Sequence, residues 1–268
     1  MNPFRQLLLR AGRTPPLGTW LLSGSTLLAE AAGYAGFDFG IIDMEHGPLD
    51  MAEAVQLLQA VASTRMVPML RVPWNDTVAI KRVLDAGATT LVVPFVQSAA
   101  QAAAAVAATR YPPQGVRGMV GMSRASRFGT QADYLVSANR GIALVVQIET
   151  EAAVAELPAI AAVDGVDAIF VGPADLSASM DLTGQLRHPR VIEAMVEIAR
   201  RCRAIGKPVG SVGSDLEVLA QYRAAGYDFL AIDSDLGLFM QGAQQAISAL
   251  RGRDGEHVHR IDGGTREA

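Results

Sequence analysis

Eight short runs of β-branched and aromatic residues recur along this 268-residue chain, and most are followed by a longer stretch with apolar residues three and four positions apart. The first pattern indicates buried strands and the second amphipathic helices. The expected strands are 17–22, 39–44, 67–72, 90–95, 143–149, 168–172, 208–212 and 229–233. Eight βα units predict an α/β fold: one (β/α)8 TIM barrel over residues 1–250, followed by a polar tail at 251–268.

Composition excludes several classes of protein. Half of the residues are hydrophobic, which suffices for a large core, and the net charge of -4 offers no basic stripe for nucleic acid. The single cysteine, Cys202, rules out a disulfide framework and fits a reducing compartment. The apolar stretch near the start, Leu7 to Leu9, is too short for a signal peptide, and no run is long enough to span a membrane. We therefore expect a cytoplasmic protein with no membrane or nucleic-acid partner.

Polar side chains stand at the ends of several expected strands. In a TIM barrel these ends carry the functional loops, because the interior below them is packed. A further segment, 111–140, is long and carries three arginines near its middle (Arg117, Arg124 and Arg127), and we expect a loop over one mouth of the barrel. The strand-end set is Asp43, Glu45, His46, Arg71, Gln147, Glu149 and Asp175.

Two of these acids are candidates for holding a metal ion. Alternation along the fifth strand directs Gln147 and Glu149 to the same side, toward the barrel axis, where a carboxylate needs a partner. A cation shared by Glu149 and Asp175 supplies one, and oxygen ligands without cysteine or a second histidine suit Mg²⁺ or Mn²⁺ better than zinc. The alternative is that each acid only forms an ordinary ion pair. Their occurrence together on neighbouring strands argues against this alternative.

Proton transfer and charge stabilisation have their own candidates. His46 is the one histidine expected near this mouth, and so the proton carrier, because His188 lies in a loop and His257 and His259 belong to the tail. Arg71 can hold a carboxylate or enolate oxygen, or merely pair with an acid. The only lysines, Lys81 and Lys207, are badly placed for a Schiff base.

The histidine also needs a carboxylate to orient its ring. Asp43 is close in sequence, whereas Asp85 reaches the same area only if its loop folds back, and a capping role for Asp85 is equally open.

The segments DMEHGP, LRVPWND, RYPPQGVRG, VVQIETEAAV and FVGPADLSASMDLTGQ together resemble the HpcH/HpaI family of class II pyruvate aldolases, in collinear order from about residue 17 to 250. The resemblance implies an enzyme that makes or cleaves 4-hydroxy-2-oxo acids through a metal-bound pyruvate enolate, releasing pyruvate and an aldehyde. It implies Mg²⁺, Mn²⁺ or Co²⁺ on Glu149 and Asp175, an enolate stabilised by Arg71, and His46 as the base. Known substrates in the family include hydroxy-oxo-heptanedioate, deoxy sugar acids and glucarate derivatives.

The resemblance extends to the remaining site residues and to assembly. It implies that an aspartate at Asp43 or Asp85 tunes the histidine, and that substrate is held by Gln147, Gly172, Pro173, Ala174 and Asp175. It also implies a homotrimer or homohexamer that exchanges C-terminal helices. Asp181 and Asp233 depart from the family pattern, in which small residues are common at both positions.

Two other functions compete with the aldolase. One is a lyase acting on a CoA thioester, as in the citrate-lyase branch of the superfamily, for which the arginines of segment 111–140 would have to bind the CoA phosphates. The other is a non-enzymatic scaffold, against which the intact set of His46, Arg71, Glu149 and Asp175 argues.

Overall fold

The computed structural model describes residues 1–10 and 14–251 and confirms the expected barrel. Eight parallel strands close in sequence order, with the last strand paired to the first. Each observed strand coincides with an expected one to within two residues at either end. They are β1 (Leu17–Leu21), β2 (Phe39–Asp43), β3 (Val67–Arg71), β4 (Thr90–Val93), β5 (Ala143–Ile148), β6 (Ala168–Val171), β7 (Val209–Gly213) and β8 (Phe229–Ser234).

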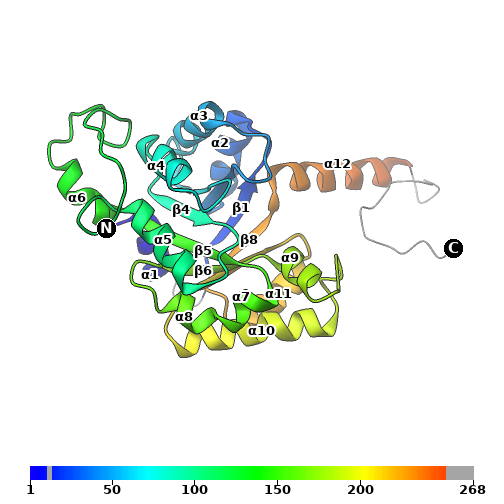
Figure 1. Ribbon diagram of the computed structural model, residues 1–268. Coiled ribbons are helices and arrows are strands. Elements are labelled where there is room, and N and C mark those ends of the chain that lie inside the picture. The colour runs from blue at the N-terminus through cyan, green and yellow to red at the C-terminus, as the bar shows by residue number, and fades with distance from the viewer. Residues whose placement is uncertain (11–13, 252–268) are drawn as a thin grey trace.

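Helices surround the barrel, and α12 extends away from it (Figure 1). Many begin at a polar side chain that accepts a backbone N–H, such as Ser25, Asp76 and Ser98. The helices are α1 (Pro3–Arg10), α2 (Thr26–Ala35), α3 (Met51–Val61), α4 (Thr77–Asp85), α5 (Ala99–Thr109), α6 (Tyr134–Gly141), α7 (Glu151–Ala155), α8 (Leu157–Ala161), α9 (Pro173–Ser179), α10 (Pro189–Ala204), α11 (Leu216–Ala225) and α12 (Asp235–Arg251).

The barrel interior is a packed core rather than a channel. Aromatic rings from different strands meet edge to face inside it, such as Phe39 and Phe229 with ring centroids 5.9 Å apart. Gly18 and Gly210 make room for these rings, because a Cβ at either glycine would overlap Phe39 or Phe229. A second and larger apolar cluster fills the space between the strands and the surrounding helices.

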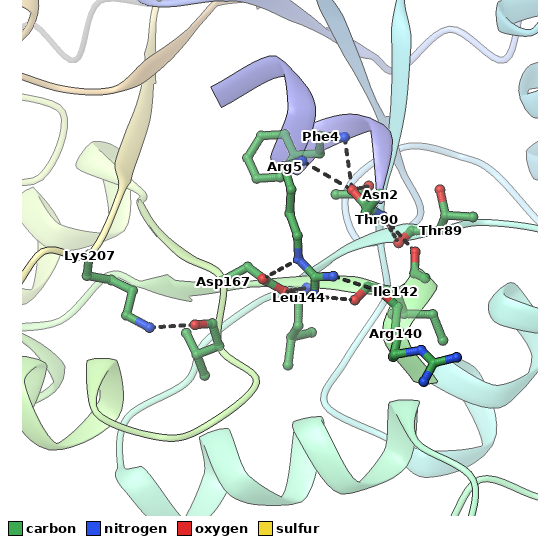
Figure 2. A network of polar contacts seen from close by, with 12 residues as sticks. Asn2, Phe4, Arg5, Thr89, Thr90, Arg140, Ile142, Leu144, Asp167 and Lys207 are labelled. Atoms are coloured by element: carbon green, nitrogen blue, oxygen red, sulfur yellow. Dashed lines mark hydrogen bonds and ion pairs between the residues drawn. The ribbon is translucent and has the colours of Figure 1, made fainter. Parts of the chain in front are cut away.

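Helix α1 closes the N-terminal end of the barrel. Phe4 is fully buried and packs edge to face on Phe229, with the two ring centroids 5.1 Å apart. Figure 2 shows the polar contacts around it: Asn2 donates to the carbonyls of Thr89 and Gly141, and Arg5 pairs with Asp167. Chemistry is therefore left to the opposite, C-terminal end.

Segment 111–140 differs in part from the expectation. It contains helix α6, and it packs at the N-terminal end of the barrel, where the N–H of Ala125 donates to the carbonyl of Asp85. Arg117 is buried against Asp85 at 2.7 Å, and Arg124 donates to the carbonyl of Ala86. The arginines therefore lie at the end of the barrel away from the polar strand ends.

Within residues 1–10 and 14–251, no helix is both long and apolar enough to cross a membrane. The expected tail, 251–268, lies outside the described residues except for Arg251, which ends α12.

Candidate active site

Asp43 and Arg71 end neighbouring strands and form a buried pair. They stand opposite each other in the β2–β3 register, so both side chains leave the barrel at the same level. Arg71 donates from Nε to Asp43 Oδ1 at 2.7 Å and from Nη2 to Oδ2 at 2.6 Å. Its guanidinium also lies over the Trp20 ring, with Cζ 4.1 Å from the centroid. The bidentate hydrogen bond to Asp43 and the stacking on Trp20 hold the positively charged guanidinium of Arg71 in a fixed orientation.

The predicted support of His46 by Asp43 is not what the structure shows. The Asp43 carboxylate is engaged with Arg71, and it reaches His46 only through the backbone N–H, 3.4 Å from Oδ1. The His46 side chain is 66% exposed, and its Nε2 has Glu45 Oε2 as the nearest carboxylate oxygen, at 3.9 Å. The reason is geometric, because Asp43 faces the neighbouring strand β3 while His46 stands in the following turn.

Asp85 does not join the site within this chain. It is the last residue of α4, at the N-terminal end of the barrel, and its carboxylate pairs with Arg117 at 2.7 Å. His46 follows a strand at the C-terminal end. The condition for its predicted role, that its loop folds back toward His46, is not met inside one chain.

Glu45 belongs to the site, although from the sequence it was placed at a strand end without an assigned role. Its Oε2 lies 3.0 Å from Arg71 Nη1. Burial raises the pKa of the Glu45 carboxyl, with Asp43 and Asp175 adding to the rise and Arg71 opposing it. Its place between Asp43 and His46 in one short segment was the available signal.

Glu149 is a buried carboxylate of the site. It is 4% exposed, and both oxygens accept hydrogen bonds from neutral groups: Oε1 from the N–H of Phe95 at 2.9 Å and Oε2 from Gln147 Nε2 at 2.7 Å. Burial, together with the nearby Asp175 and Glu45, raises the pKa of Glu149 from 4.5 to about 7, although the hydrogen bonds from Phe95 and Gln147 oppose the rise. Among the residues that the structure describes, no cationic side chain is paired directly with this carboxylate.

Phe95 is a contributor that strand and helix patterns could not reveal. It lies just after β4 with φ of 52°, a left-handed conformation that is unusual for a residue other than glycine. This backbone conformation accompanies the N–H directed at Glu149. Strained residues of this kind gather at functional sites, where the surrounding structure maintains them.

The segment from Gly172 to Asp175 brings the second acid to the same place. A Cβ on Gly172 would come within 2.6 Å of Glu149 Oε2, so only glycine allows this close approach. Pro173 starts α9, and Asp175 lies in its first turn. Asp175 and Glu149 thus come from consecutive strand ends, as the sequence predicted.

These side chains surround a cavity of about 370 Å³. The cavity is lined by Asp43, His46, Arg71, Gln147 and the segment from Gly172 to Asp175, and Gln147 in turn donates a hydrogen bond to Glu149. Among the residues that the structure describes, no group of three or more histidines, cysteines or acids is arranged as a metal cage.

Two carboxylates fit a divalent cation that keeps open positions. Mg²⁺ and its relatives commonly take one or two protein carboxylates and complete their shell with water or substrate oxygens. The uncompensated charge at Glu149, next to Asp175, is what such an ion would neutralise. The donor set therefore fits an oxygen-seeking dication.

The fold and these side chains define a barrel enzyme whose acids and guanidinium converge at the C-terminal strand ends. The model of the HpcH/HpaI aldolase/citrate lyase family matches residues 17–242, and the chain belongs to this family. The chain is 46% identical to the 2-dehydro-3,6-dideoxy-6-sulfogluconate aldolase of Pseudomonas putida over 241 residues. This match covers 90% of this chain and 94% of that protein.

Two further comparisons agree. The chain is 41% identical over 250 residues to the 5-keto-4-deoxy-D-glucarate aldolase of Salmonella arizonae, covering 93% of this chain and 97% of that protein. A crystal structure of an HpcH/HpaI aldolase/citrate lyase family protein from Burkholderia cenocepacia matches with a TM-score of 0.90 and 41% identity, covering 94% of this chain and 100% of that one. The predicted enzyme class is confirmed: the protein is an aldolase, a carbon–carbon lyase.

Proposed function

We propose that this aldolase makes or cleaves 4-hydroxy-2-oxo acids, with pyruvate and an aldehyde as the partners of the reaction, and that it depends on a divalent cation. One observation carries the proposal: Asp175, Gln147 and Arg71 line a single cavity, and Gln147 is hydrogen-bonded to both Arg71 and Glu149. This arrangement matches a small 2-oxo acid, which needs a cation for its two oxygens and a fixed positive charge for the developing enolate. The relatives at 41 to 46% identity, named as aldolases of sugar-acid derivatives, support the same reading.

A dication held by Glu149 and Asp175 would supply Lewis acidity that polarises the keto group of the substrate. Arg71 presents its positive charge already oriented by Asp43 and Trp20, so little reorganisation is needed when the oxyanion forms. Gln147 is hydrogen-bonded to both Arg71 and Glu149 and fixes the position of one relative to the other. Pro173 and Ala174 line the cavity beside Asp175 and are the proposed backbone contacts for substrate.

His46 is the proposed base. In the cleavage direction it accepts the proton of the 4-hydroxyl group as the C3–C4 bond breaks, and the bonding electrons pass to the pyruvate enolate. Its ring lines the cavity and is largely open to solvent, so it can exchange the proton with water. Asp43 serves in this proposal as the positioning residue of Arg71.

The test is release of pyruvate from a 4-hydroxy-2-oxo acid, followed with lactate dehydrogenase and NADH. Exhaustive chelation with EDTA should abolish release, and adding back Mg²⁺, Mn²⁺ or Co²⁺ should restore it and rank the three ions. Pyruvate added directly to the chelated assay checks that the coupling enzyme still works. Full activity after chelation would refute the metal dependence, and no release from any such acid would refute the reaction.

The CoA-thioester alternative is less well supported. Its basic groove was to come from Arg117, Arg124 and Arg127, yet Arg117 is buried against Asp85 and Arg124 bonds the backbone at the end away from the cavity. Acetyl-CoA should therefore change neither the activity nor the thermal unfolding of the protein.

We further propose a cytoplasmic homotrimer or homohexamer. The support is helix α12, which extends away from the barrel (Figure 1) and exposes apolar side chains that include Phe239 and Leu250. Light scattering coupled to size-exclusion chromatography tests it, and a monomer at micromolar concentration would contradict it.

A further inference from the structure

The cavity has two sides of different chemistry. The strand ends from β2 to β6 carry the acids, Arg71 and Gln147, and under the proposed function they hold the pyruvate half of the substrate. The strand ends of β7, β8 and β1 form the opposite side, toward which the aldehyde half must extend. That side is lined by Trp20, Leu22, Val212, Ser214, Asp233 and Ser234.

Asp233 is the one charged side chain on this second side among the described lining residues. Its φ is 48°, in the left-handed region that residues other than glycine rarely adopt. The carboxylate is held from two directions: Oδ1 accepts the N–H of Ser234 at 2.7 Å, and Oδ2 accepts Nε2 of Gln241 from α12 at 2.6 Å. Gly237 leaves space for it, because a Cβ there would overlap Asp233 Oδ1.

The negative charge of Asp233 has no cation on its own side of the cavity. Its three donors, the backbone N–H and the hydroxyl of Ser234 and the amide of Gln241, are neutral. Arg71 is the one guanidinium lining the cavity within the described residues, and its nitrogens bond Asp43 and lie 3.0 Å from Glu45. An anionic group at the far end of an aldehyde would therefore meet a like charge, whereas hydroxyl groups would find a carboxylate that accepts their hydrogen bonds.

We propose that Asp233 determines aldehyde specificity: it favours uncharged, hydroxylated aldehydes and disfavours anionic ones. The inference rests on the proposed function, since it concerns the second substrate of the same cavity. A strained backbone conformation maintained at the rim of a site, with a side chain bonded on both oxygens, is consistent with a role in recognition.

The experiment measures pyruvate addition to three aldehydes: glyceraldehyde, propanal and succinic semialdehyde. These are uncharged and hydroxylated, uncharged without hydroxyls, and anionic. The wild type should prefer glyceraldehyde. Asp233→Asn keeps the size and tolerates the left-handed backbone, and it should raise kcat/KM for succinic semialdehyde relative to propanal by about tenfold, the effect of one unit charge at about 6 Å in a partly aqueous cavity. Asp233→Gly suits the same backbone and should give the same change.

Asp181→Asn is the matched control. Asp181 also has a left-handed backbone, with φ of 60°, and its loss removes the same formal charge, but it is exposed and lies outside the cavity lining. Its ratio of anionic to neutral acceptors should equal that of the wild type. Ratios unchanged in both Asp233 variants would overturn the specificity role while leaving the aldolase intact. Absence of product with all three aldehydes would instead overturn the proposed function, and this inference with it.

Discussion

The two ends of the barrel handle charge in opposite ways. At the N-terminal end, Arg5 bonds both oxygens of Asp167 and the carbonyls of Arg140 and Ile142 (Figure 2). At the C-terminal end, Glu149 accepts only neutral donors, and burial raises the pKa of its carboxyl to about 7. The first end satisfies its charges within the chain and stabilises the fold, whereas the second leaves negative charge for a cation to neutralise.

Backbone strain follows the same division in part. Phe95 and Asp233 both have positive φ, and both lie at C-terminal strand ends, Phe95 bonded to Glu149 and Asp233 lining the cavity. Such conformations cost folding free energy and persist where a function requires them. The comparison therefore predicts that substitutions at the C-terminal end change activity, and those at the N-terminal end change stability.

The largest expected effect is that of Glu149→Gln. The amide keeps the shape but loses the charge that we propose to bind a dication, so kcat should fall by about 10³ or more, the scale of losing a principal electrostatic contributor. The coupled pyruvate assay at saturating Mg²⁺ measures it, and circular dichroism checks that the fold is retained. A variant with wild-type kcat would remove Glu149 from the metal site.

Asp43→Asn should have a smaller effect, lowering kcat by about 10² because Arg71 loses its two-pronged carboxylate partner. The pH–rate profile distinguishes the two roles considered for Asp43. If it positions Arg71, kcat falls without displacement of the profile. A displaced acidic limb would instead show that Asp43 tunes His46.

The apoprotein should show a pH-dependent stability that originates at Glu149. The pKa of this carboxyl is raised from 4.5 to about 7 in the folded state, so its contribution is fully present below about pH 4.5 and is lost as pH rises through about 7. The loss amounts to about 3 kcal/mol at most. In EDTA, Glu149→Gln should therefore be more stable than the wild type at pH 8, and Mg²⁺ should remove the difference. Urea unfolding measures both, and equal stabilities at pH 8 in EDTA would contradict the prediction.

Arg5→Ala should have the smallest effect and on stability alone, about 1 to 2 kcal/mol, because it removes a partly buried ion pair and two bonds to carbonyls. Arg200→Ala is its control, since Arg200 bonds Glu197 with equally short distances but on the exposed surface, and its loss should leave stability unchanged. Both variants should keep wild-type kcat. A drop in kcat for Arg5→Ala would break the division between the two ends.

Much of the fold could be predicted from sequence because its signals are local. Strand runs and helical spacing are read within a few residues, and all eight expected strands form. The strand ends that would carry acids followed from the same pattern, and Glu149 with Asp175 do lie on consecutive strands. Family resemblance added the reaction class, which the comparisons with known proteins confirm.

Only the closed barrel decided which groups became partners. The Asp43 carboxylate pairs with Arg71, 28 residues away, rather than with the nearby His46, because β2 and β3 place Asp43 and Arg71 opposite each other. Asp85 forms an ion pair with Arg117 at the N-terminal end of the barrel, and the N–H of Phe95 donates to Glu149, 54 residues further along the chain. The spacing of apolar residues along a sequence shows where strands and helices form. The partner of a carboxylate, however, depends on distances in space, and these are fixed only when distant strands come together.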